Sequence, residues 1–411
     1  MTAAVLAVAV SACKKIDYDH NAVIENMKAT FYNDTIDANH TWKLYNEHVI
    51  GVTANVPDVE TVALFTGDPY GTEQSFQLAQ CAVTEGETVT LTYSIPNIYS
   101  TLFAAAITKN GTYYVTETSI GASAVDFSDV EPYAGTRPLN TADQEMYYCF
   151  SSSYPEPSKT WDFNDVVLRV SKQQLTDDSL RISVTLEAVG ALSQMAAALR
   201  LYGVKYDEIE SVKQSKPFVR NEELTRYIIT SEEPLLKGRH DEAVLNLFDD
   251  AHAAFYSGLA STGSVYRYYY NVSHQGNNGY FVRATTTVDY DIKFKTPGMA
   301  GMVSYERLDP FIAYGYGGII VETHKFAYQQ DEVLFSYFTG NPKDYVTGFT
   351  WVVEVPYNWF RYPLEGNAMG SYKNGALYGS YNQPYHSFGE WAADRSKAQD
   401  WYLYPSTNMV Y

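Results

Sequence analysis

Apolar residues at alternate positions, in short runs that end at turn residues, constrain the fold of this chain most strongly. In 89–95 every second residue is apolar, and Pro96 ends the run. Side chains of an extended chain alternate between two faces, so this pattern predicts a β-strand with one buried face. Residues 104–108 and 113–116 flank Asn110-Gly111, a pair that strongly favours a tight β-hairpin. The pattern therefore predicts an antiparallel β-sandwich.

The alternating runs fall into two regions, and we predict a mainly β fold with two β-sandwich-like domains. Residues 14–40 form a polar spacer, 41–136 form the N-terminal sandwich, and a second β-rich region begins near Met146. With 411 residues, of which 45% are hydrophobic, the chain can bury a core in each domain. No sequence period typical of repeat proteins occurs, which argues against a repeat architecture.

The second region mixes strand and helix patterns. Strands are predicted at 166–170, 182–186 and 281–294. A helix is predicted over 241–257, ending at Gly258, from apolar residues at helical spacing: Val244, Leu247, Phe248, Ala251 and Phe255. A last helix is predicted over 384–395, with Pro384 near its start. The C-terminal domain is therefore expected to carry helical insertions.

Composition limits the classes of partner. The formal net charge is −19 at pH 7 and no basic run occurs, which argues against general electrostatic binding of nucleic acid. Tyrosine is abundant, with 37 residues against 19 Phe and 6 Trp. An aromatic ring with a polar tip suits exposed, ligand-stacking faces, but β-strands also favour Tyr. We favour the second explanation for most of these residues.

We predict different roles for the three cysteines. Cys13 ends an apolar run, and Val10-Ser11-Ala12-Cys13 matches a bacterial lipobox, in which the Cys thiol is diacylated after cleavage. The run is too short for a transmembrane helix. We therefore predict that residues 1–13 are a lipoprotein signal with its acylated Cys, which anchors the protein to the outer membrane of the cell envelope. In an exported protein, Cys81 and Cys149 could form a disulfide.

Oxygen-bearing side chains gather in Trp161-Asp162-Phe163-Asn164-Asp165, directly before the predicted strand at 166–170. In an extended chain, Asp162 and Asn164 would project together and Asp165 would turn away. Carboxylate and amide oxygens on a loop suit Ca²⁺, and the candidate ligands are Asp162, Asn164, Asp165 and Thr160. The alternative is an Asx-turn network in which these side chains hold neighbouring backbone N–H groups.

Together with two later stretches, this motif resembles the LruC-domain lipoproteins, a family of exported bacterial proteins whose domain function is unassigned. The stretches that carry the resemblance are 161–167, 310–312 with 321–324, and 360–365 with Tyr385, Phe388, Trp391 and 400–402. The resemblance covers 146–404 and implies an LruC-like β domain with an ion site at the motif. Relatives commonly place acidic residues just ahead of the motif. This chain has Ser151-Ser152 and Thr160 there, so the resemblance implies a weakened or lost site.

Two other groups of polar residues have chemistry that binding or catalysis uses. Glu322 and His324 share one strand face, either as a metal or acid–base pair or, as we favour, as a hydrogen-bonded pair that closes a sheet beside Lys325. The second group surrounds the predicted helix and comprises His240, Asp241, Asp249, Asp250 and His252. Its histidines lack the i, i+4 spacing of metal-binding helices, so we expect a solvated helical face.

Aromatic side chains supply the candidate ligand contacts. Tyr266, Tyr268 and Tyr270 alternate along a predicted strand and are the first choice for a glycan or protein contact. Trp391 and Trp401 could form a ligand-stacking platform. We favour a packed C-terminal lock around Trp391 and 400–402, because aromatic side chains bury large areas.

No motif predicts catalysis, since the sequence has no Gly-x-Ser-x-Gly elbow, phosphate-binding Gly-rich loop or His-Glu-x-x-His. We predict a lipid-anchored, non-catalytic interaction or adhesion module of the cell envelope, with Ca²⁺ as its one candidate cofactor and a glycan or protein as partner. A carbohydrate-binding surface lipoprotein that uses its Tyr-rich strands is the alternative. A hydrolase with an unrecognised carboxylate pair is the third hypothesis.

Overall fold

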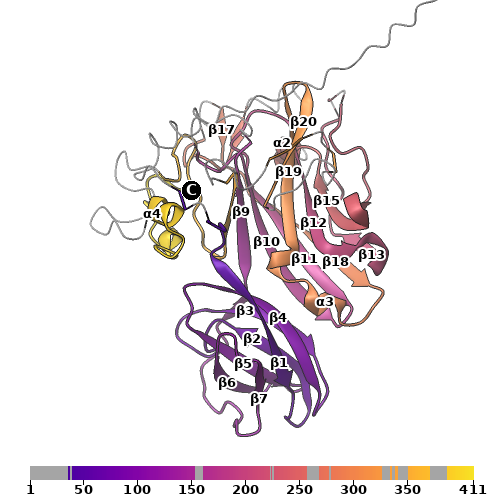
Figure 1. Ribbon diagram of the computed structural model, residues 1–411, viewed down its shortest axis with the longest axis vertical. Coiled ribbons are helices and arrows are strands. Elements are labelled where there is room, and N and C mark those ends of the chain that lie inside the picture. Colours follow the sequence, from indigo (N-terminus) through magenta and orange to yellow (C-terminus); the bar gives the residue numbers. More distant parts are fainter. Residues whose placement is uncertain are drawn as a thin grey trace, which may run out of the picture.

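The computed structural model describes residues 36–37, 39–152, 161–222, 224, 226–256, 268–276, 279–325, 334–335, 338–340, 350–370 and 387–411. Strands dominate these residues and form two domains (Figure 1). The smaller domain, in indigo and purple, lies below the larger one and comes first in the sequence. The predicted mainly β fold is confirmed.

The N-terminal domain contains a three-stranded and a five-stranded sheet. The strand order is β4-β1-β7 in the first and β6-β5-β2-β3-β8 in the second. The strands are β1 (Tyr45–Thr53), β2 (Val59–Phe65), β3 (Ser75–Ala82), β4 (Thr88–Pro96), β5 (Thr101–Thr108), β6 (Tyr113–Ser119), β7 (Ala124–Asp126) and β8 (Thr141–Asp143). Because β8 pairs with β3, this domain continues past residue 136, its predicted end.

The predicted alternation sets the core of this domain. Leu91, Tyr93 and Ile95 of β4 are buried, and β5 and β6 form the expected antiparallel hairpin around Gly111. Gly111 has a φ of +80°, a left-handed conformation that glycine adopts without strain. Local sequence signals were therefore sufficient to predict these strands and their turn.

The C-terminal domain packs two six-stranded sheets on a common core. One sheet has the order β13-β18-β11-β10-β9-β22, and the other β14-β15-β12-β19-β20-β21. The strands of the first are β9 (Glu145–Phe150), β10 (Val166–Thr176), β11 (Ser179–Ala188), β13 (Ile209–Gln214), β18 (Thr286–Phe294) and β22 (Val352–Val355). Those of the second are β12 (Met195–Lys205), β14 (Leu235–Lys237), β15 (Glu242–Phe248), β19 (Leu308–Tyr316), β20 (Ile319–His324) and β21 (Phe338–Gly340).

The predicted strands of this domain correspond to observed ones. The strands predicted at 166–170 and 182–186 lie within β10 and β11, which pair antiparallel. The strand predicted at 281–294 is divided, because β17 (Tyr280–Phe281) pairs with β16 (Tyr269–Tyr270) in a separate small sheet before β18 begins.

Helices are short in the described part of the chain. They are α2 (Ala251–Tyr256), α3 (Met299–Met302), α4 (Phe388–Ala393) and the 3₁₀ turns η1 (Tyr206–Glu208), η2 (Arg239–Asp241), η4 (Tyr305–Arg307) and η7 (Trp401–Leu403). The predicted helix over 241–257 is wrong in its first half, where β15 lies. Every residue of β15 is buried, so its sequence lacks the alternation of a half-exposed strand. Gly258 lies outside the described residues.

The last predicted helix is confirmed over a shorter range. The prediction covered 384–395, and α4 spans Phe388–Ala393. Ser387 caps its N-terminus, since Ser387 Oγ accepts a hydrogen bond from Glu390 N (3.1 Å). Residues 384–386 lie outside the described residues.

The central strands of the larger domain are buried on both faces. In β9, Tyr148 and Phe150 face the core between the two sheets, whereas Tyr147 and Cys149 face a second core. We call this second core the aromatic core, and its rings include Trp42, Tyr147, Trp161, Phe163, Trp351, Phe360, Trp391 and Trp401. Residues from the C-terminal part of the chain, coloured yellow in Figure 1, cover it. The domain therefore has three layers, namely two sheets and a C-terminal cover.

Residues ahead of β1 join this cover. Asp37 N donates to Ala392 O (2.9 Å), and the Trp42 ring lies edge-on to that of Trp391 with centroids 5.4 Å apart. The end of the predicted polar spacer therefore packs against α4.

The two described cysteines are both free thiols. Cys81 is buried in the N-terminal domain and Cys149 in the aromatic core. The suggested disulfide is wrong, because both thiols are free and lie in separate cores. Cys13 and the predicted signal lie outside the described residues. In the part of the chain that the structure describes, no helix is both long and apolar enough to cross a membrane.

Candidate functional site

The loop 161–165 turns into the aromatic core instead of running as an extended strand. Trp161 and Phe163 have φ values of +50° and +51°. Both side chains are fully buried, and the Trp161 and Trp351 ring centroids lie 5.8 Å apart. The expected extended alternation is therefore wrong here. Positive φ is strained for aromatic residues, and burial of both rings offsets the cost.

The polar side chains between these rings fasten the loop to a distant segment. Asp162 Oδ2 accepts a hydrogen bond from Gly366 N (2.9 Å), and Asn164 Nδ2 donates to Pro363 O (3.1 Å). Both side chains are buried. They hold backbone groups, as in the predicted alternative to an ion site, but the partners are remote in sequence rather than neighbouring.

Asp165 is hydrogen-bonded to Ser152. The family resemblance implies an acidic residue at the position of Ser152. Asp165 Oδ2 accepts hydrogen bonds from Ser152 N (2.5 Å) and Ser152 Oγ (3.0 Å). Burial raises the pKa of Asp165, and the two bonds from Ser152 oppose this effect. Thr160, the other hydroxyl candidate, lies outside the described residues.

Glu365 completes a group of three carboxylates. Burial, Asp162 and Asp165 together raise the pKa of Glu365 to about 8. Glu365 Oε2 and Asn164 Oδ1 are both buried without a hydrogen-bond partner among the described residues. Glu365 was part of a family-like stretch in the sequence, but nothing in the sequence indicates that it lies near the loop. We call Asp162, Asp165 and Glu365 the acidic group.

Two stacked tyrosines are coupled electrostatically to the acidic group. The rings of Tyr269 in β16 and Tyr280 in β17 have centroids 4.8 Å apart and planes 16° apart, and both side chains are half-buried. Burial, and after it Glu365, raises the pKa of both phenols. The region therefore combines carboxylates with a partly exposed aromatic pair.

The acidic group is organised by its hydrogen bonds rather than around a preformed ion cage. Among the described residues, no three His, Cys, Asp or Glu side chains are already arranged to hold a metal ion. Asp162 and Asp165 point to different backbone partners, Gly366 and Ser152. Chemically, the group can take up a proton or a cation, because three acids share a partly buried region.

Glu322 and His324 belong to a buried ionic network at the end of β20. His324 Nδ1 lies 2.9 Å from Asp309 Oδ2, and His324 Nε2 lies 2.9 Å from Glu322 Oε2. Burial lowers the pKa of His324, but Asp309 and Glu322 outweigh it and raise the pKa to about 9. Beside them, Lys325 pairs with Glu354 (2.9 Å). The favoured hydrogen-bonded pair is confirmed, and Asp309 is a partner that the sequence did not indicate.

The polar group around α2 is not a solvated helical face. Asp249, Asp250 and His252 are fully buried where β15 leads into α2. Asp249 Oδ1 accepts a hydrogen bond from Ile229 N (2.5 Å), so this carboxylate fixes a neighbouring loop. The prediction is therefore wrong for the buried residues. The exposed members are His240 and Asp241.

The candidate ligand-contact aromatics lie largely in the interior. Tyr270, Trp391 and Trp401 are at most 1% exposed, and Tyr268 is half-buried against Phe281. This burial leaves no open ring face for a ligand on the three buried residues. Burial of Trp391 and Trp401 agrees with the favoured interpretation that these rings pack the C-terminal segment onto the domain. Their ring centroids lie 5.9 Å apart. Tyr266 lies outside the described residues.

Comparison with known proteins gives a family but no activity. The family described as domain of unknown function DUF4842 matches residues 178–402. A crystal structure of a predicted lipoprotein from Bacteroides ovatus is similar in fold, with a TM-score of 0.52 and 16% identity over 87% of this chain and 99% of that chain. No curated protein matches. Membership of the LruC-domain lipoproteins stays a prediction. Because the family match spans more than half of the sequence, the chain belongs to the DUF4842 family.

Proposed function

We propose that this protein is a lipid-anchored, non-catalytic binding module of the cell envelope. The lipobox at 10–13 supports the anchor, and the similar fold of a predicted lipoprotein is consistent with it. The net charge of −19 favours partners other than nucleic acid. An interaction or adhesion role suits two β domains, because the loops that connect strands commonly carry binding residues.

In this proposal, Ca²⁺ stabilises the larger domain by binding the acidic group. The observation that carries this step is the convergence of three carboxylates, one of which has a buried oxygen, Glu365 Oε2, without a hydrogen-bond partner in the described part of the chain. Asn164 Oδ1 is a second buried oxygen of the kind that Ca²⁺ prefers. The donor chemistry therefore fits the ion. Bound Ca²⁺ would supply positive charge and strengthen the attachment of the loop 161–165 to 363–366.

Millimolar Ca²⁺ is expected to raise the melting temperature of the protein, and this rise should be lost when Asp162→Ala and Asp165→Ala are combined. An ion that binds the folded state alone adds stability by mass action, about 2–4 °C for each kcal/mol in domains of this size. Differential scanning calorimetry with and without Ca²⁺ measures the shift. Asp129→Ala with Glu131→Ala removes two exposed acids from the N-terminal domain and is the matched control. An unchanged melting temperature of the native protein would contradict the proposal.

Glu365→Gln separates ion binding from proton binding. The pKa of Glu365 is about 8 in the folded protein against an ordinary value of 4.5, so folding favours its protonated form. Its stabilising effect is present below pH 4.5 and is lost as the pH rises to about 8. Without Ca²⁺, Glu365→Gln should therefore melt higher than the native protein at about pH 8–9, while responding less to Ca²⁺. An undiminished Ca²⁺ response would remove Glu365 from the site.

Cys13→Ala is expected to release the protein from membranes, because the thiol that would carry the lipid is removed. Membrane and soluble fractions of cells expressing each form, followed by immunoblotting, measure the effect. Cys81→Ala deletes a thiol elsewhere and should leave the membrane fraction unchanged. Retention of Cys13→Ala in the membrane fraction would rule out this anchor.

A carbohydrate-binding lipoprotein is the second candidate. The stacked, half-buried pair Tyr269 and Tyr280 supports it, because aromatic faces beside carboxylates can pack on a sugar ring and accept hydrogen bonds from its hydroxyls. A glycan array tests it, with Tyr280→Ala expected to abolish any signal. The hydrolase hypothesis rests on the raised pKa of Glu365 alone, and a screen with chromogenic glycosides tests it.

A further inference from the structure

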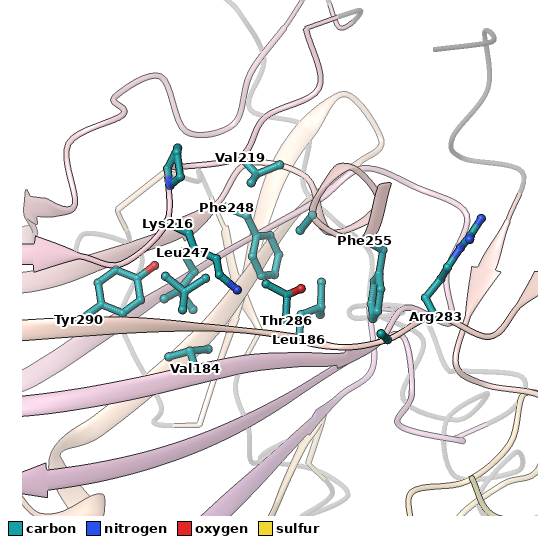
Figure 2. A pocket seen from close by; sticks show the side chains of 14 residues that line it. Val184, Leu186, Lys216, Val219, Leu247, Phe248, Phe255, Arg283, Thr286 and Tyr290 are labelled. Atoms are coloured by element: carbon teal, nitrogen blue, oxygen red, sulfur yellow. The ribbon is translucent and has the colours of Figure 1, made fainter. Parts of the chain in front are cut away.

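A cavity of about 600 Å³ opens between the two sheets of the C-terminal domain. Its walls come from β11 and β18 on one side and from β15 and α2 on the other (Figure 2). The volume lies in the range of roughly 300–1,000 Å³ that is typical of small-molecule sites. The acidic group does not line this cavity, so the cavity is distinct from the region of the Ca²⁺ proposal.

Apolar side chains form most of the cavity wall. Val184 comes from β11, Leu247 and Phe248 come from β15, and all three are buried. Phe255 of α2 closes one end, and its ring is stacked on Tyr270 with centroids 5.2 Å apart. The stack holds the Phe255 ring in place, so the wall is preorganised for an apolar ligand.

The charged side chains of the lining are two cations. Lys216 and Arg283 line the cavity and no carboxylate does, although the chain has 48 acidic against 29 basic residues. Neither cation forms an ion pair with a described residue. Figure 2 shows the Lys216 amine reaching inward near Leu247, with Arg283 at the other end beyond Phe255. The cavity therefore combines an apolar wall with a cation at each end.

We propose that this cavity binds a single-chain amphiphile with a carboxylate head group. The apolar chain would lie along Val184, Leu247 and Phe248, where its burial is favourable. The carboxylate would pair with the Lys216 amine, which has no anionic partner among the described residues. A cationic head group would meet the like charge of Lys216, and a neutral one would leave that charge without an anionic partner among the described residues, so the lining favours the anion.

Titration calorimetry of the full chain with dodecanoate, below its micelle concentration, tests the proposal. Dodecanoate should bind at one site, and dodecanol and dodecyltrimethylammonium should bind more weakly. Lys216→Gln should weaken dodecanoate binding by about ten-fold, as expected for loss of one charge-assisted contact. Lys109→Gln removes an exposed lysine from the N-terminal domain and should leave affinity unchanged. No dodecanoate binding, or equal affinity for the three amphiphiles, would overturn the proposal.

Ala254→Trp places the ligand inside the cavity. Ala254 lines the cavity from α2, so a large ring at this position should occupy the space and abolish binding. Thermal unfolding verifies that this variant is folded. Full binding by folded Ala254→Trp would overturn the assignment to this cavity, and Lys216→Gln, which changes an exposed side chain, gives an independent answer.

Discussion

His324→Ala is expected to lower the free energy of unfolding by about 3–5 kcal/mol near pH 6. His324 lies between Asp309 and Glu322, with both distances 2.9 Å and all three side chains at most 2% exposed. Removing the ring leaves two carboxylates in a buried sheet without their shared positive partner. The ring also stacks on Phe311 with centroids 4.2 Å apart, so the variant loses packing as well as charge.

The loss should be smaller at high pH. The pKa of His324 is about 9 in the folded protein against an ordinary value of 6.5, so its charged form stabilises the fold. This contribution is fully present below pH 6.5 and is lost as the pH rises through 9. Urea unfolding at about pH 6 and about pH 10 should therefore show a difference in the cost of the variant on the order of 3 kcal/mol.

A second variant identifies the charge as the cause. Glu322→Gln removes one carboxylate, so His324→Ala should cost less in that background than alone, which a double-mutant cycle measures. His48→Ala changes a partly exposed histidine of β1 and controls for loss of a ring in general. A cost for His324→Ala below about 1 kcal/mol, or one that does not change with pH, would contradict the ionic account.

The strands with one exposed face could be predicted from the sequence, and those buried on both faces could not. In β4, alternation from Val89 to Ile95 was visible because one face is partly exposed. In β15, every residue is buried, so Val244, Leu247 and Phe248 fell by chance on a helical period. Hydrophobic periodicity reflects the difference in burial between the two faces of a strand. Where tertiary packing buries both faces, that difference disappears.

The conformation of the loop 161–165 also could not be predicted from local sequence. The sequence identified Asp162, Asn164 and Asp165 as a group, but it assumed an extended chain, which the positive φ of Trp161 and Phe163 excludes. That conformation is held by the aromatic core, whose rings come from distant parts of the chain. Packing between distant parts of the chain also brings Glu365 close to the loop. The local motif therefore grouped the polar side chains of the loop, while their hydrogen-bond partners depended on long-range packing.

Trp401→Ala should also be strongly destabilising, by about 3–5 kcal/mol, because the Trp401 side chain is fully buried in the aromatic core. Its ring centroid lies 5.1 Å from that of Phe388 and 5.9 Å from that of Trp391. Truncation would leave a cavity at the centre of the C-terminal cover. Urea unfolding followed by circular dichroism measures the loss.

Trp359→Ala is the matched control, since this ring is 53% exposed and should cost much less. The aromatic core holds both Trp161 at the start of the acidic loop and Trp401, so loosening the cover should loosen the loop. Met369 N donates to Trp161 O (2.9 Å), which ties the loop to the cover through the backbone. Trp401→Ala should therefore also reduce the Ca²⁺-induced rise in melting temperature. If Trp401→Ala lowers the free energy of unfolding as little as Trp359→Ala does, the cover adds little stability. The acidic group would then depend on its own hydrogen bonds alone.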